Sequence, residues 1–251
     1  MTTRILATSG GFTGTGLWGV QRPGRTILRA LALTGKQRPR VVLVMTATGD
    51  DPAYLARMYS ALSSTSCDVD HLALFPQPNR NPADLLPAAD VVWVGGGSVA
   101  NLLSLWRLHE VDAAMREAWQ SGTILAGVSA GSICWHVGGP TDSFGSTLRP
   151  ITNGLGLLPF GNGVHYDSEA QRRPLLQTLV SDGVLPTSYA TDDYVGILYE
   201  GTTPVEVICD VDADPSTGPA AYRIERIGNA IVETRLTPGD PACLEQAVTP
   251  D

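Results

Sequence analysis

The stretch Gly127-Val128-Ser129-Ala130-Gly131 directly follows the apolar run 123–126. It predicts a buried strand, a sharp turn and the start of a helix, which is the layout of a nucleophile elbow. Small residues at 127, 130 and 131 leave room for a strained turn that exposes the serine hydroxyl. The first N–H groups of the following helix carry partial positive charge, which suits a developing oxyanion. Ser129 is therefore a candidate nucleophile.

Length and composition favour one globular domain. The chain has 251 residues, of which 43% are hydrophobic, and a formal net charge of −8. We assign the domain to residues 1–237 and a C-terminal tail to 238–251. A surface of this sign repels nucleic acid and anionic membranes, so neither is expected as a partner. Either a monomer or a homodimer fits the sequence.

The cysteines and the N-terminus indicate a cytoplasmic protein. The N-terminal residues run straight into a strand-like segment without the apolar region of a signal peptide, and no stretch approaches the roughly 20 apolar residues of a membrane span. The four cysteines lie far apart without a C-x-x-C pair, which favours reduced thiols. They are Cys67, Cys134, Cys209 and Cys243.

Strand-length apolar runs alternate with helical patterns through most of the chain. The expected strands are 4–8, 41–46, 69–74, 91–94 and 123–128. The expected helices are 26–33, 52–63, 99–108, 111–120 and 168–179. Such alternation implies right-handed crossovers and a parallel sheet covered on both faces. We therefore predict an α/β fold with three layers, α/β/α, around a mostly parallel sheet.

After residue 187 the pattern changes to short strand-like pieces separated by Gly, Pro and Asp turns. These pieces are 195–200, 205–210, 221–227 and 230–236. We expect them to extend one edge of the sheet as antiparallel strands.

A serine nucleophile needs a base within hydrogen-bond reach, and the chain has four histidines. His136 would rise about 10 Å along a continued helix from Ser129, too far for direct contact. His71 and His109 fit surface or boundary positions. His165 lies in a glycine-rich loop before a helix, and loops on a rigid scaffold commonly carry catalytic side chains. His165 is the predicted base.

A carboxylate must then hold the imidazole in the right tautomer and stabilise its charged form. Asp142 would give the chain order Ser-Asp-His, whereas Asp192 or Asp193 would give Ser-His-Asp. Sequence order alone leaves these alternatives open.

A second glycine-rich segment, Gly95-Gly96-Gly97-Ser98, follows the expected strand 91–94. Its glycines let the main chain approach a reacting carbonyl, and the N–H of Gly97 is the candidate partner of the Ala130 N–H in an oxyanion hole. No complete phosphate-binding pattern and no H-E-x-x-H pair is present, so neither a cofactor nor a metal is expected. Arg172 and Arg173 are candidates to bind a substrate carboxylate.

Together these segments resemble the peptidase E and cyanophycinase family of serine peptidases, whose fold is related to class I glutamine amidotransferases. The resemblance spans nearly the whole chain. It includes Thr46-Ala47-Thr48, the 95–98 loop, the elbow 128–132, the segment 154–157 that leads to His165, and the turn 192–196. The family order implies Ser129 as nucleophile, His165 as base and Asp193 as orienting acid. Asp192 is the alternative acid, and Asp142 is demoted.

The resemblance further implies hydrolysis of short peptides through an acyl-enzyme, with dipeptides, including Asp-X, as candidate substrates. Peptidase E proper pairs the substrate aspartate with an arginine shortly after the catalytic histidine. Glu169 stands at that position here, and Arg172 or Arg173 lies one turn further along. Ser98 replaces a frequent asparagine in the loop expected to hold the substrate main chain. The same scaffold also suits an esterase or other acyl hydrolase, or a catalytically silent binding module.

Overall fold

A seven-stranded sheet lies at the centre of the computed structural model, which describes residues 2–17 and 19–238. The strand order is β13-β12-β1-β7-β6-β4-β5. The five parallel strands are β1 (Arg4–Thr8), β7 (Ile124–Val128), β6 (Val91–Val94), β4 (Arg40–Val44) and β5 (Asp68–Leu72). Two antiparallel strands, β12 (Val195–Glu200) and β13 (Thr203–Cys209), complete one edge. The structure therefore confirms the predicted mostly parallel sheet with antiparallel edge strands.

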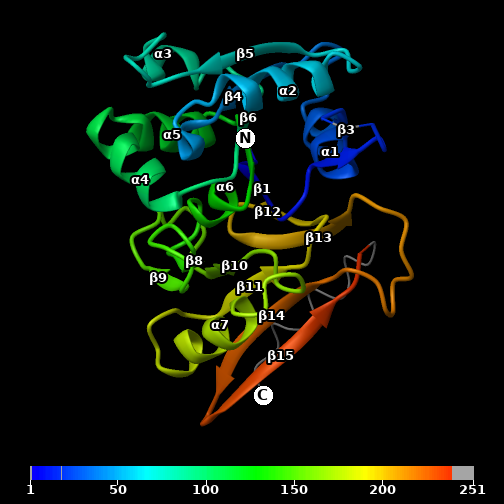
Figure 1. The fold of residues 1–251 in the computed structure, drawn as a ribbon, viewed down its shortest axis with the longest axis vertical. Helices are drawn as coiled ribbons and strands as arrows, with labels where there is room; N and C mark the ends of the chain where they lie inside the picture. The colour runs from blue at the N-terminus through cyan, green and yellow to red at the C-terminus, as the bar shows by residue number, and fades with distance from the viewer. Residues whose placement is uncertain (1, 18, 239–251) are drawn as a thin grey trace.

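Helices cover both faces of this sheet, as the alternating pattern predicted (Figure 1). The larger ones are α1 (Arg25–Leu33), α2 (Pro52–Leu62), α4 (Val99–Leu108) and α5 (Val111–Gln120). Along β4, Val42 and Val44 belong to the apolar cluster that contains α4 and α5 residues. Val41 and Leu43 belong to the cluster that contains α1 and α2 residues. A strand buried on both faces must be apolar throughout, which is why β4 has no polar side.

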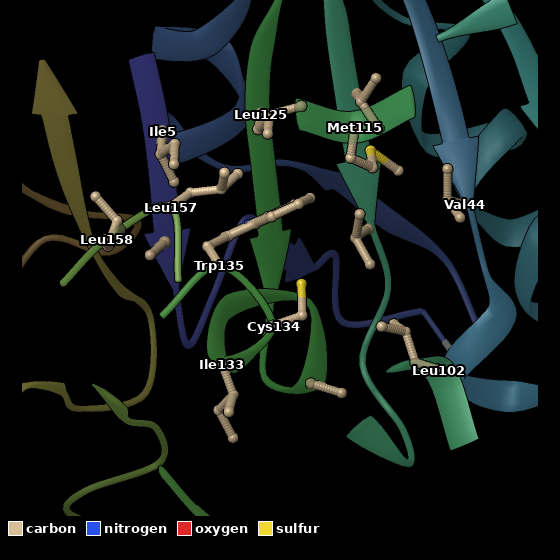
Figure 2. Close-up of a cluster of buried hydrophobic side chains, with 14 of the residues drawn as sticks. Ile5, Val44, Leu102, Met115, Leu125, Ile133, Cys134, Trp135, Leu157 and Leu158 are labelled. Carbon is tan, nitrogen blue, oxygen red and sulfur yellow. The ribbon is translucent and has the colours of Figure 1, made fainter. Parts of the chain in front are cut away.

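The core cluster on the α4 and α5 side extends under the elbow. Figure 2 shows Leu125 of β7 among the buried side chains, with Cys134 and Trp135, which follow the elbow helix, nearby. Trp135 is fully buried. The short helix after Ser129 is thus fixed to the sheet by its own apolar side chains.

A second sheet corrects one expectation from the sequence. Its order is β10-β11-β14-β15. The strands are β10 (Gly161–Gly163), β11 (Ser188–Thr191), β14 (Ala221–Ile227) and β15 (Ala230–Leu236). The prediction of edge strands is right for β12 and β13 and wrong for β14 and β15. Instead, β14 pairs with the edge that the short strand β11 provides, and β15 pairs with β14.

The helix α7 (Arg172–Ser181) packs against this second sheet, below the central sheet in Figure 1. It begins later than the predicted 168–179, because residues 165–171 form turns instead. The remaining elements are β2 (Phe12–Gly14), β3 (Gln21–Pro23), η1 (Thr46–Thr48), α3 (Pro82–Leu85), α6 (Ala130–Ile133), β8 (Gly139–Thr141) and β9 (Arg149–Ile151). Because α6 ends at Ile133, His136 lies beyond the helix, fully buried.

Two sequence expectations reach beyond the described residues. Of the proposed tail 238–251, residues 239–251 lie outside them, and so does Cys243.

Cys67, Cys134 and Cys209 are free cysteines. Among residues 2–17 and 19–238, no helix combines the length and apolarity needed to cross a bilayer.

Truncating one buried leucine of α4 tests how the helix packs on the sheet. We expect Leu102→Ala to lower the free energy of unfolding by about 2–5 kcal/mol, because Leu102 is fully buried and its loss leaves a cavity. Leu108→Ala in the same helix is the matched control, since Leu108 is 75% exposed. Its effect should stay below about 0.5 kcal/mol. Urea denaturation measures both, and equal effects would contradict the described packing.

Candidate active site

Ser129 occupies a strained turn between β7 and α6. Its backbone angles are φ 56° and ψ −112°, a region that residues with a side chain rarely adopt. Glycine is required at position 131 because β6 passes close to it: a Cβ on Gly131 would lie 2.3 Å from the carbonyl oxygen of Val94. The half-buried serine therefore sits at a strand-to-helix turn that only small neighbours permit.

The glycine loop after β6 lies directly beside this turn. A Cβ built on Gly96 would lie 3.2 Å from Ser129 Cβ and 3.8 Å from its Oγ. Gly97 has a φ of 135°, and a Cβ there would lie 2.4 Å from the carbonyl oxygen of Ala47. Glycine at position 97 thus lets the loop pass close to the main chain at the end of β4. Ala130 follows Ser129 at the first position of α6, where a helix has N–H groups without helical acceptors.

Ser98 has a structural partner within its own helix. Its hydroxyl accepts a hydrogen bond from the N–H of Asn101 at 3.2 Å and caps α4. Its N–H donates to the carbonyl of Ala47 at 2.8 Å. Ser98 therefore fixes the exit of the glycine loop, a contact that the S-x-x-N spacing could have indicated.

Tyr54 of α2 also borders the glycine loop, although it belongs to no motif in the sequence. A Cβ on Gly95 would lie 3.1 Å from Cε1 of the Tyr54 ring. Burial raises the pKa of the Tyr54 hydroxyl, opposed in part by a hydrogen bond from the backbone of Gly96. The tyrosine thus supports the loop from the side that faces α2.

His165 and Asp193 form a close pair. Nδ1 of His165 lies 2.6 Å from Oδ1 of Asp193. The N–H of Asp193 donates to Oδ1 of Asp167 at 2.9 Å, which holds the aspartate backbone. His165 itself has a φ of 51°. Asp167 thus supports the turn at Asp193 through a contact between two separate turns, which no local sequence pattern indicates.

The carboxyl end of β1 links this pair to Ser129. The carbonyl of Thr8 accepts the N–H of Ser129 at 3.0 Å. The next side chain, Ser9, accepts the N–H of His165 at 3.0 Å. Val128, His165 and Asp193 line one cavity of about 290 Å³. The serine and the histidine–aspartate pair are thus anchored on consecutive residues of one strand end.

The other two acid candidates lie elsewhere. Asp192 is buried, and its Oδ2 accepts the N–H of Ala220 at 2.9 Å and the hydroxyl of Tyr222 at 3.2 Å. Burial raises the pKa of the Asp192 carboxyl. The side chain of Asp142 is 64% exposed and lies 4.0 Å from the guanidinium of Arg172. Of the three aspartates, Asp193 is the one paired with His165.

The candidate substrate-binding charges beside α7 are engaged within the protein. Arg172 is buried, and its Nε lies 2.7 Å from Glu169 while another guanidinium nitrogen donates to the carbonyl of Pro140. The guanidinium of Arg173 lies over two neighbouring aromatic rings, 4.6 Å from the centroid of Tyr166 and 4.7 Å from that of Tyr222. Each guanidinium therefore has partners in the fold.

Metal-ligating side chains are not grouped in the part of the chain that the structure describes. No three His, Cys, Asp or Glu residues come together there as a ligand set.

A strained serine and a histidine–carboxylate pair, anchored at the same strand end, are the groups that acyl transfer through a serine nucleophile requires. On a three-layer α/β fold, this arrangement places the chain among the serine hydrolases. The model of peptidase family S51 matches residues 18–207. The chain belongs to this family and is a serine peptidase, as the resemblance to peptidase E predicted.

Similar proteins support the same assignment. The uncharacterized peptidase YgaJ of Bacillus subtilis (strain 168) is 36% identical over 203 residues, which cover 80% of this chain and 84% of that protein. Peptidase E of Shewanella denitrificans is 29% identical over 143 residues, which cover 53% of this chain and 59% of that protein.

Two crystal structures share the fold. A peptidase from an acI-B1 Actinobacterium has a TM-score of 0.65 at 17% identity, covering 96% of both chains. A proposed peptidase E protein from Listeria monocytogenes EGD-e has a TM-score of 0.56 at 16% identity, covering 94% of this chain and all of that one. At these identities the likeness concerns the fold alone.

The pH dependence of stability tests the buried state of Asp192. Because its folded pKa lies above the ordinary 3.8, the carboxyl contributes stability below that pH and loses it as the pH rises through the raised pKa. Asp192→Asn cannot ionise. We expect the variant to gain stability relative to the wild type as the pH rises above about 4, measured by urea denaturation. Asp142→Asn corrects for the general effect of the exchange. If the difference in the free energy of unfolding between Asp192→Asn and the wild type did not change with pH, ionisation of Asp192 would not destabilise the folded state.

Proposed function

We propose that the chain hydrolyses dipeptides and other short peptides through an acyl-enzyme, with Ser129, His165 and Asp193 as the catalytic triad. The contact of 2.6 Å between His165 Nδ1 and Asp193 Oδ1 carries this proposal. With Nδ1 directed to the aspartate, Nε2 is the ring nitrogen left to accept the proton of the Ser129 hydroxyl. The strand end that holds both backbones supports this pairing.

The reaction follows from these roles. Oγ of Ser129 attacks the scissile carbonyl while His165 takes its proton, and Asp193 stabilises the resulting imidazolium. The N–H groups of Gly97 and Ala130 receive the oxyanion, which they stabilise most strongly when charge has developed. His165 then gives its proton to the leaving amine. Water, deprotonated by the same imidazole, attacks the ester and releases the acid.

Asp193 is favoured over Asp192 as the orienting acid by the surroundings of the two carboxylates. Asp192 contacts Ala220 and Tyr222 rather than an imidazole, and its other oxygen is buried with no hydrogen-bond partner among the described residues. An orienting acid must remain ionised to stabilise an imidazolium, and burial disfavours that form of Asp192. Half-buried Asp193 keeps access to water.

The contacts of Glu169 and its neighbours bear on the substrate. Arg172 is buried against Glu169, and Arg173 packs over the rings of Tyr166 and Tyr222 and lies 3.3 Å from Glu233. Neither guanidinium is placed to pair with a substrate aspartate. We therefore include Asp-X dipeptides among the substrates without a requirement for N-terminal aspartate.

Substitutions at the proposed triad should distinguish Asp193 from Asp142 as the orienting acid. Ser129→Ala and His165→Ala should lower kcat by about 10³-fold or more, because each removes a group that acts in the transition state. Asp193→Asn should cost about 10³–10⁴-fold, since it favours the wrong imidazole tautomer. Asp142→Asn, at an exposed side chain, is the matched control and should change kcat little. A large loss for Asp142→Asn with full activity of Asp193→Asn would reverse the assignment.

A dipeptide library tests the substrate class. Wild-type protein should release free amino acids from dipeptides, and Ser129→Ala should not, because hydrolysis requires the nucleophile. Varying the first residue measures the N-terminal preference, and simple aryl esters serve as the comparison. Hydrolysis of the esters without any dipeptide would identify an acyl hydrolase instead. A wild-type protein that a fluorophosphonate fails to label would lack an activated serine.

A further inference from the structure

The cavity beside His165 has walls from distant parts of the chain. They come from the loop after β1, from the β2–β3 hairpin, from α2, from the end of β7 and from the turn at Asp193 and Tyr194. Its volume of about 290 Å³ is near the lower end of the range of about 300–1,000 Å³ for small-ligand pockets. It is therefore suited to one side chain rather than to a long peptide.

Four residues of the lining form an apolar wall. Tyr54 and Met58 stand four positions apart on α2 and so share one helix face. Phe12 of β2 packs edge-on against the ring of Trp93, with centroids 5.3 Å apart. Val128, which precedes the nucleophile, completes this wall. Packing of these groups against the core keeps the apolar wall in place.

The charged and polar groups of the lining disfavour an anionic side chain. Ser9 Oγ already bonds the backbone of His165 and the hydroxyl of Thr191. Asp193 carries the one carboxylate among the described lining residues, and these include neither lysine nor arginine. A second carboxylate in the cavity would be repelled by Asp193, with no lysine or arginine among the described lining residues to offset the repulsion.

We propose that this cavity receives the side chain of the residue on the leaving side of the scissile bond, and that it selects an apolar side chain there. The inference rests on the proposed function, because it uses His165 as the acid that protonates the leaving amine. That amine must come within hydrogen-bond reach of the imidazole. The Cα bonded to this amine carries the side chain of the leaving residue, which then lies against the cavity that His165 borders. Leucine, methionine and phenylalanine fit its apolar wall, whereas aspartate and glutamate do not.

A dipeptide series with a fixed first residue and a varied second residue tests this selection. The first residue is the one that the wild-type protein prefers in the library. We expect kcat/KM to be at least about tenfold higher for leucine, methionine or phenylalanine in second place than for aspartate. Equal or better turnover with aspartate or lysine in second place would overturn the inference.

A charge added at the cavity rim provides the second test. Gln21 is exposed on β3 and lines the cavity, so Gln21→Arg introduces a cation without burying it. The variant should raise the ratio of kcat/KM for aspartate over leucine in second place by about tenfold. Gln120→Arg is the matched control, an exposed position at the end of α5 that precedes the opposite end of β7. Its ratio should equal that of the wild type.

The outcomes distinguish the two proposals. Equal shifts in both arginine variants would show a general effect of charge and overturn the cavity assignment. Hydrolysis of dipeptides with no preference for an apolar second residue would overturn it as well, while leaving the proposed function intact. If the wild-type protein hydrolyses no dipeptide, the proposed function fails and this inference fails with it.

Discussion

The backbone and side-chain hydrogen bonds at the carboxyl end of β1 constrain the rest of the site. Thr8 accepts the N–H of Ser129 through its carbonyl and donates its hydroxyl to the carbonyl of Val195 at 2.8 Å. Ser9 then bonds both the N–H of His165 and the hydroxyl of Thr191. Because β1 lies between β7 and β12 in the central sheet, these bonds join that sheet to the end of β11 in the second one. The backbones of Ser129 and His165 are therefore both anchored at this strand end, one by the carbonyl of Thr8 and the other by the hydroxyl of Ser9.

Much of the central sheet could be predicted from hydropathy, and the second sheet could not. The strand 91–94 and the helix 111–120 match the structure because buried parallel strands are apolar throughout and amphipathic helices repeat at helical spacing. β10 has three residues and β11 four, too short for a periodic signal. Because the sequence pattern does not predict β10 and β11, it offers no partner for β14 in a second sheet. A position beside β13 at the edge of the central sheet is then the simpler prediction.

The choice of the aspartate that pairs with His165 shows, for single residues, that local sequence patterns do not predict long-range contacts. Sequence order left Asp142, Asp192 and Asp193 open, and only the family resemblance favoured Asp193. In the structure, the two neighbouring carboxylates have different partners. Asp193 contacts the imidazole of His165, whereas Asp192 accepts hydrogen bonds from Ala220 and Tyr222. Ala220 and Tyr222 come from a segment 28 and 30 positions further along the chain. No local pattern encodes contacts of that separation.

The contacts of the last strand have a consequence for when the site can form during synthesis. Tyr166, next to His165, donates its hydroxyl to Glu233 of β15 at 2.7 Å, and Gln177 of α7 donates to the same carboxylate at 2.9 Å. A chain still emerging from the ribosome lacks these two hydrogen bonds until β15 has been synthesised and paired with β14. The segment next to His165 therefore depends on a residue 67 positions further along the chain, so β15 must fold before this segment has all of its contacts.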